Sequence, residues 1–186
     1  MKEFWNENKK IIRKLILNQF IAAFFGLTLV LSASAADSIK DKLEMLMSII
    51  AVLFFMFLIY NILWEKGGED RIRIDGGRQR YSVLKGLWIS LIANIPNFII
   101  ASVIIIARPF AETQSWAGTM YLVGRTASLI WEAMYAGLIG YFAPYNPIAH
   151  LLIIFPALLT CTLAYYFGVN NKRLFGFLAS RKKEAK

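Results

Sequence analysis

The polar residues whose spacing is most suited to chemistry lie in one largely apolar stretch, residues 119–141. Five polar side chains recur there every three or four residues: Tyr121, Arg125, Ser128, Glu132 and Tyr135. This spacing places them in one stripe along a single helical face. Ionisable side chains are rare in apolar stretches because lipid solvates charge poorly. Arg125 and Glu132 are therefore candidate residues for binding a solute.

Enzymatic patterns are scarce in this chain. His150 is the only histidine, which excludes a metal site built on two histidines. It lies at the start of the apolar stretch 148–167, and this position predicts an interfacial polar residue. The membrane-length apolar stretches contain no paired carboxylates, and the sequence contains no GxSxG pattern. We therefore expect a protein that is not an enzyme and that uses no cofactor or metal.

Two other apolar stretches carry proline near their midpoints. Asn94, Pro96 and Asn97 lie in one of them and Pro156 in the other. Proline removes a backbone donor and kinks a helix, so the first stretch should present two amides at a kink. Transporters build substrate sites at such broken helices. The same kinks also serve packing alone, and we rank that interpretation first.

Four stretches are long and apolar enough to cross a membrane. A span needs about 20 mostly apolar residues, and the stretches that meet this length are residues 15–33, 43–63, 86–107 and 148–167. The chain is also 58% hydrophobic, well above the usual share in soluble domains. The sequence thus predicts a single domain, an all-α polytopic integral membrane helix bundle.

The basic residues predict the orientation of this bundle. Most of them lie in three segments that flank the apolar stretches: residues 1–14, 64–85 and 169–186. Cytoplasmic loops collect Lys and Arg, so we expect all three in the cytoplasm and the chain in the cell membrane. The net charge of +9 then requires no nucleic acid. Anionic lipid headgroups would attract the basic ends.

The same rule predicts the number of spans. An even number must separate residues 64–85 from the basic tail, and the stretches 86–107 and 148–167 already supply two. We therefore expect four full spans, with residues 119–141 forming an amphipathic or re-entrant helix on the outer side. Five spans are the alternative, because a charged pair buried inside a bundle costs less than one exposed to lipid.

Residues 64–85 form a charged insert between two apolar stretches. Glycine pairs at 67–68 and 76–77 favour turns, and residues 71–75 alternate polar with apolar. We expect a compact loop, solvated and holding its own ion pairs, with a short two-stranded excursion as an option. The alternative is a surface that binds a partner protein through Arg71, Arg73, Asp75, Arg78 and Arg80.

Three smaller features complete the sequence-based predictions. Ala33-Ser34-Ala35 resembles a signal-peptidase site, but the preceding apolar stretch is long, so we favour an uncleaved anchor helix over a signal peptide. Cys161 is the only cysteine, so no disulfide can form within the chain. Residues 169–186 predict a short amphipathic surface helix and a soluble end.

Two functions fit these features. The first is an accessory or scaffold subunit that binds another membrane protein through the charged insert, and we rank it slightly ahead. The second is a small-solute transporter, or a membrane component of one, with its site near the middle of the membrane. The sequence names neither the solute nor the partner.

Overall fold

The computed structural model describes residues 2–35 and 39–172. Every regular element in these residues is a helix, which confirms the all-α prediction. The elements in chain order are α1 (Lys2–Ala33), α2 (Lys40–Asp75), α3 (Lys85–Ala93), α4 (Ile95–Ala107), the 3-10 turn η1 (Arg108–Phe110), α5 (Ser115–Trp131), the 3-10 turn η2 (Ala133–Tyr135), α6 (Ala136–Phe142), α7 (Ala149–Leu152) and α8 (Ile154–Val169).

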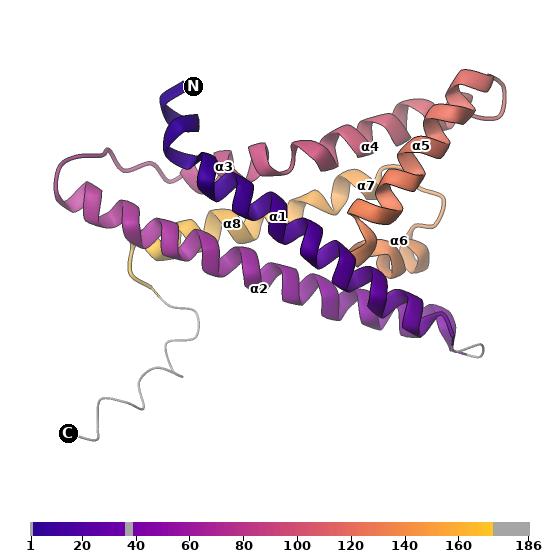
Figure 1. Cartoon of the computed structure of the whole chain (residues 1–186), viewed down its shortest axis with the longest axis horizontal. Helices are drawn as coiled ribbons and strands as arrows, with labels where there is room; N and C mark the ends of the chain where they lie inside the picture. Colours follow the sequence, from indigo (N-terminus) through magenta and orange to yellow (C-terminus); the bar gives the residue numbers. More distant parts are fainter. Residues whose placement is uncertain (1, 36–38, 173–186) are drawn as a thin grey trace.

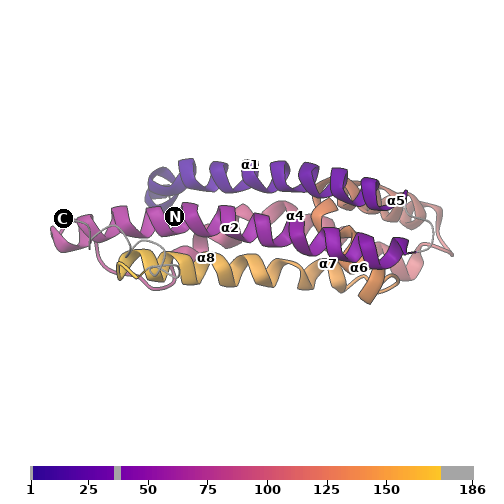
Figure 2. The ribbon, with the colours of Figure 1, turned by 90° about the horizontal axis from the view of Figure 1, so that it is seen from below.

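The long helices run side by side along the molecule. Helix α2 packs against both α1 and α8. The three helices lie roughly parallel in Figure 2, whereas in Figure 1 α8 is inclined to α1 and α2. Among the described residues, three helices are long and apolar enough to cross a membrane: α1, α2 and the unit Ala149–Val169. The bent pair α3 and α4 would make a fourth.

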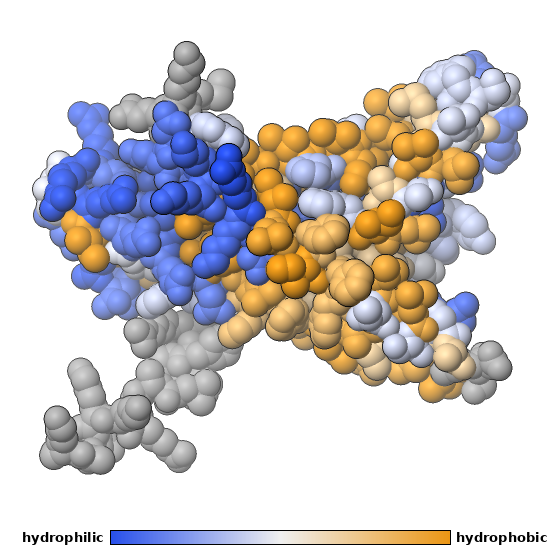
Figure 3. Space-filling view, in the orientation of Figure 1, coloured by the Kyte–Doolittle hydropathy of each residue, from blue (hydrophilic) through white to orange (hydrophobic). Residues whose placement is uncertain are grey.

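Most of the charged residues gather at one end of this bundle. Helix α1 begins there, α2 ends there, α3 begins there and α8 ends there (Figure 1). Hydrophilic residues cover this end, and an apolar band follows it along the long axis (Figure 3). We call this the basic end, formed by residues 2–14, 64–85 and 165–172. The opposite end, which carries η1 and α6, is the distal end.

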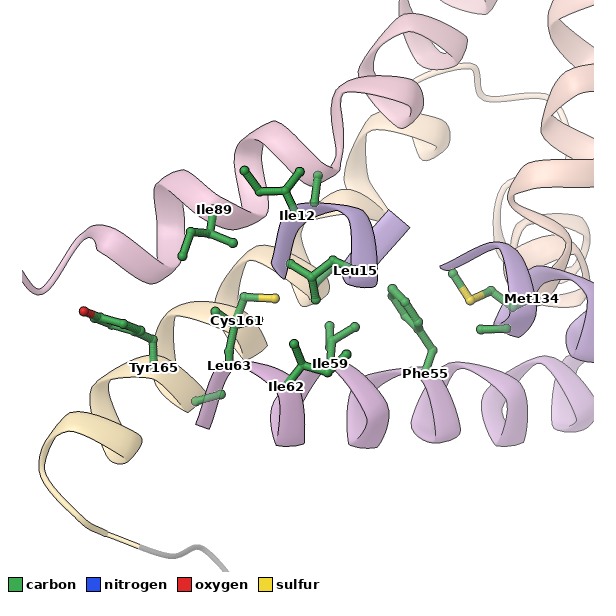
Figure 4. Packing of buried hydrophobic residues seen from close by; sticks show 14 of the residues in the cluster. Ile12, Leu15, Phe55, Ile59, Ile62, Leu63, Ile89, Met134, Cys161 and Tyr165 are labelled. Carbon is green, nitrogen blue, oxygen red and sulfur yellow. The ribbon is translucent and has the colours of Figure 1, made fainter. Parts of the chain in front are cut away.

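The core lies between α1, α2, α3 and α8. Its large buried side chains come from all four helices and interlock in Figure 4, where Ile12, Phe55, Ile59, Leu63, Ile89 and Tyr165 are among those labelled. Cys161 is buried in the same cluster as a free thiol. Burial of apolar side chains on one face of each helix holds the basic half of the bundle together.

The charged insert is mostly helical, so the prediction of a compact loop is wrong for residues 64–75. Helix α2 continues to Asp75, and the two-stranded excursion is absent from the described residues. Ion pairs one helical turn apart, Lys66 with Asp70 and Arg71 with Asp75, stabilise this extension. Only residues 76–84 connect α2 to α3 without a helix.

A glycine contact explains why the helix continues through the first glycine pair. An added Cβ at Gly67 would lie 2.5 Å from the Tyr165 carbonyl oxygen, and one at Gly168 would lie 2.2 Å from that of Trp64. Absence of side chains at Gly67 and Gly168 therefore lets α2 and α8 approach backbone to backbone. The glycine that suggested a turn serves helix packing.

The predicted proline kinks are present. Helices α3 and α4 meet at Asn94 with a bend of 55°. In the last apolar stretch, α7 and α8 are separated at Ile153. Pro156 has no N–H to bond the carbonyl of Leu152, which accounts for this break. The Pro156 side chain is exposed on the outside of the bundle.

Residues 119–141 do not form one continuous helix, so that expectation is wrong. Helix α5 starts at the distal end and runs inward, η2 turns the chain, and α6 runs back out (Figure 1). At the turn, Met134 packs against Gly26 of α1, and the Gly137 N–H donates to the Ser48 hydroxyl of α2 at 2.8 Å. The predicted tail helix lies partly in residues 173–186, outside the described residues.

Candidate functional site

Three ionisable side chains meet where α5 turns into η2. Glu132 lies at the end of α5, Arg125 lies two turns earlier, and His150 arrives from α7. The His150 Nδ1 is 2.7 Å from Glu132 Oε2, and its Nε2 is 3.2 Å from Arg125 Nη1. Glu132 and His150 are almost fully buried, whereas Arg125 is half-buried. The imidazole thus bridges a guanidinium and a carboxylate.

The bonding pattern assigns the tautomer of His150. A guanidinium has only donors, so Nε2 must accept the hydrogen bond from Arg125. Nδ1 then carries the proton and donates it to Glu132. In this arrangement each ring nitrogen of His150 has one charged side chain as its partner.

One carboxylate oxygen in this cluster is left open. Glu132 Oε1 is buried and has no hydrogen-bond partner among the described residues. Buried acceptors are nearly always satisfied, so such an oxygen requires an explanation. Glu132 also lines a cavity of about 140 Å³ together with Arg125, Ser128 and His150. The open oxygen and the cavity make this cluster the candidate site.

The cavity has polar and apolar walls. Helices α5 and α6 supply Leu129, Ala136 and Ile139, while the exposed residues Gly140 and Pro144 lie at its rim. A few polar groups that converge in a largely apolar hollow are typical of sites for small ligands. The arrangement can orient a polar solute through Arg125 and Glu132 and exclude water around the rest of it.

The arrangement differs from a serine hydrolase triad. The Ser128 hydroxyl lies 3.4 Å from His150 Nδ1, the same nitrogen that bonds Glu132. A triad needs the serine on one ring nitrogen and the carboxylate on the other. Here Arg125 occupies the second nitrogen. Ser128 lines the cavity, but its contact with His150 lacks the geometry of a triad.

The described residues also offer no metal site, because no three His, Cys, Asp or Glu side chains are grouped closely enough to hold an ion. The cluster of Glu132 and His150 alone supplies two protein ligands, fewer than the three or four that zinc sites use. Nothing in the described part of the chain points to a particular cofactor.

The amides predicted near mid-membrane form a separate cluster. Gln19 Nε2 donates to Asn97 Oδ1 at 2.6 Å, Asn97 Nδ2 donates to Asn94 Oδ1 at 2.7 Å, and Asn94 bonds back to Ser90. All four side chains are buried. Each link joins a donor to an acceptor, and the space beside Asn94 is only about 10 Å³. These amides tie α1 to the bend between α3 and α4.

A third buried polar cluster lies at the basic end. Asp70 accepts from Lys66 Nζ and Lys85 Nζ at 2.7 Å each, and from the Tyr165 hydroxyl at 3.0 Å. Lys85 also lies 3.7 Å from Glu7 of α1. This cluster joins α1, α2, α3 and α8. Its groups are mutually satisfied, so it acts as a structural clamp.

The structure therefore distributes the sequence-based candidates over three places. Arg125 and Glu132 belong to the candidate site, the two asparagines to the amide cluster, and Pro96 to the bend. Pro156 lies apart on an exposed surface. The residues proposed for partner binding lie on the surface of the basic end: Arg71, Arg73, Asp75, Arg78 and Arg80.

Sequence reasoning missed the contact of His150 with Glu132. The side chain is 2% exposed and pairs with Glu132, 18 residues earlier. No local spacing links the two residues, because the return of the chain from α6 through 143–148 decides their contact. The only available signal was that an apolar chain carries one histidine and one embedded glutamate.

A larger hollow lies elsewhere in the described residues. A groove of about 320 Å³ runs along α4 beside Met120 and is lined by Ile95, Phe98, Ile99, Val103 and Ile106, with Ser102 as its one polar side chain. It offers no charge to orient a ligand. We therefore place the candidate site in the cavity of about 140 Å³, because charged and polar side chains line it.

Comparison with protein-family models, curated proteins and solved structures finds no match to this chain.

Proposed function

We propose that this chain is a multi-pass membrane protein that binds a small polar solute in the cavity of Glu132, as a transporter or the membrane component of one. The observation that carries the proposal is the buried, open Oε1 of Glu132 in a cavity that Arg125, Ser128 and His150 also line. Ionisable groups inside membrane bundles mark solute or ion pathways. This observation moves solute handling ahead of partner binding.

The proposed topology supports this function. With the basic end in the cytoplasm, α1, α2, the pair α3–α4 and the unit α7–α8 make four spans. Helices α5 and α6 then re-enter from the outer side, and the cavity rim at Gly140 and Pro144 faces outward. A solute would reach Glu132 from outside the cell membrane.

Ligand-induced stabilisation tests the proposal. The full chain in lipid nanodiscs is screened by thermal unfolding against a library of small polar solutes. We expect at least one solute to raise the melting temperature, and Glu132→Gln to abolish that rise, because the substitution replaces the open acceptor by a donor. Asn97→Ala provides the control: it should lower stability but leave the ligand-induced shift unchanged.

Failure has a clear form in this screen. If no solute stabilises the wild-type chain, or if Asn97→Ala removes the shift while Glu132→Gln keeps it, the proposed site is wrong. In the second case the amide cluster would be the binding site.

Partner binding remains a second candidate because of one surface feature. The residues around the connection 76–84 expose large apolar side chains among basic ones: Ile72, Tyr81, Val83 and Leu84. Exposed apolar groups with basic neighbours suit a protein surface or a membrane surface. If the chain is an accessory subunit, substitution of Arg73 and Arg78 by Glu should release a co-purifying membrane protein. Glu132→Gln should not release that protein.

A further inference from the structure

The charge balance of the cavity restricts what can bind there. Arg125 offers only hydrogen-bond donors, Glu132 offers carboxylate oxygens, and the ring of His150 lies between them. The other titratable neighbour on this turn is Tyr135, and across from it on α2 the Glu44 carboxylate is held by Ser34 and Lys40. A ligand with only one kind of charged group would leave either Arg125 or Glu132 without a counterpart in a poorly solvated site.

Each charged residue keeps a free hydrogen-bonding group. Glu132 Oε1 accepts nothing, and Oε2 is engaged with His150. Arg125 uses one N–H on His150, and its guanidinium makes no other bond to the described residues. A guanidinium has five N–H donors and pairs well with carboxylates. The site therefore presents an open anionic acceptor and an open cationic donor set.

Arg125 and Glu132 are too far apart to pair with each other. Arg125 and Glu132 form no ion pair with each other, because the imidazole stands between them. A ligand can thus meet both only if it carries a donor cation and an acceptor anion at different atoms. The cavity of about 140 Å³ has room for roughly five water-sized groups, at about 30 Å³ each. The apolar walls from Leu129 and Ile139 leave room for a short aliphatic part.

Building on the proposed function, we infer that the solute is a small zwitterion, with its ammonium on Glu132 Oε1 and its carboxylate on Arg125. Such a ligand is neutral overall, so it leaves the charge of the site unchanged. It also satisfies the buried oxygen that the protein leaves open. Ser128 then lies beside the ligand between its two charged ends.

Matched ligands test this inference. Binding to the full chain in nanodiscs is measured by calorimetry for L-alanine, β-alanine and 4-aminobutyrate, which vary the spacing of the two charges. L-alanine ethyl ester keeps only the cation, and N-acetyl-L-alanine keeps only the anion. We expect at least one zwitterion to bind, and both one-charge analogues to bind at least about tenfold more weakly, because each leaves one buried charge unpaired.

Substitutions of Glu132 and Arg125 test which residue binds each charged end of the ligand. Glu132→Gln and Arg125→Gln should each weaken zwitterion binding at least about tenfold. In Glu132→Gln, N-acetyl-L-alanine should no longer bind more weakly than the zwitterion. In Arg125→Gln, the same should hold for L-alanine ethyl ester. Glu112→Gln and Arg108→Gln are the controls: these residues pair with each other at the distal end, outside the cavity, and should leave the affinity unchanged.

The outcomes separate this inference from the proposed function. The inference is overturned if a zwitterion and either one-charge analogue bind with equal affinity. It is also overturned if a solute that is not a zwitterion stabilises the chain and none of the three zwitterions binds. In these cases the solute site still stands. If no solute of any class binds, both fall.

Discussion

Glu132 and Asp70 are both buried carboxylates, but their surroundings give them different roles. Both oxygens of Asp70 are engaged, by Lys66, Lys85 and Tyr165. Glu132 has one engaged oxygen and one buried oxygen without a hydrogen-bond partner, and its side chain lines a cavity. A buried group with every partner present contributes to specificity of the fold, whereas one with a missing partner is available to a ligand.

Removing the charge of Asp70 should destabilise the chain strongly. In Asp70→Asn, two buried ammonium groups lose their shared counter-charge, and breaking a buried pair in this way costs about 3–5 kcal/mol. Thermal or denaturant unfolding in detergent measures the loss.

Asp75→Asn is the matched control for Asp70→Asn. The Asp75 side chain is 67% exposed and pairs with Arg71 on the same helix, so its loss should cost less than about 1 kcal/mol. Equal effects of the two substitutions would contradict the clamp.

At the scale of elements, the close contact of α2 and α8 depends on one member of a glycine pair. A Cβ added at Gly67 would lie 2.5 Å from the carbonyl oxygen of Tyr165, whereas a Cβ added at Gly68 would have no neighbouring atom within 4 Å. Because the two residues are adjacent in one helix, a comparison of substitutions at these positions separates the effect of helix propensity from the effect of packing.

Substitution by alanine should act oppositely at these two positions. Gly67→Ala forces the helices apart and should lower stability by about 1–3 kcal/mol, as overpacking does. Gly68→Ala should raise it by about 0.5–1 kcal/mol, because alanine favours a helix interior. Unfolding curves of the two variants in the same detergent provide the test, and a loss at both positions would argue against the contact.

The re-entering unit of α5, η2 and α6 depends on a second close approach. An added Cβ at Gly137 would lie 2.1 Å from the Glu44 carbonyl oxygen, while Gly140 faces open space. The absence of a side chain at Gly137 permits this close helix contact. Its contact with α2 fixes the depth of η2 and so the position of Glu132.

For the whole molecule, the arrangement of the ends gives a topology that labelling can test. In a Cys161→Ser background, a cysteine at Ser82 probes the basic end and one at Thr113 probes the distal end. Both positions are exposed. We expect a membrane-impermeant maleimide to label Thr113→Cys in intact cells and Ser82→Cys only after permeabilisation. Labelling of both from one side would overturn the four-span topology.

The sequence by itself determined the features that depend on local chemistry. Apolar length and the clusters of Lys and Arg predicted a helical chain with several membrane-length segments, and Pro96 predicted the bend at Asn94. These inferences succeed because span length and proline geometry are properties of a short segment. The helical stripe likewise identified Arg125 and Glu132.

Only the tertiary structure decided what these residues contact. Ion pairs and the packing of Gly67 on α8 extended α2 through a segment whose alternation suggested strands. The return of α6 brought His150 to Glu132, and the amides that resembled a solute site were satisfied by Gln19 of α1. Apart from the ion pairs, which join residues four positions apart, these outcomes depend on residues 18 to 101 positions apart, such as Glu132 with His150 and Gly67 with Gly168. No local pattern encodes such a contact, because it follows from how whole helices pack.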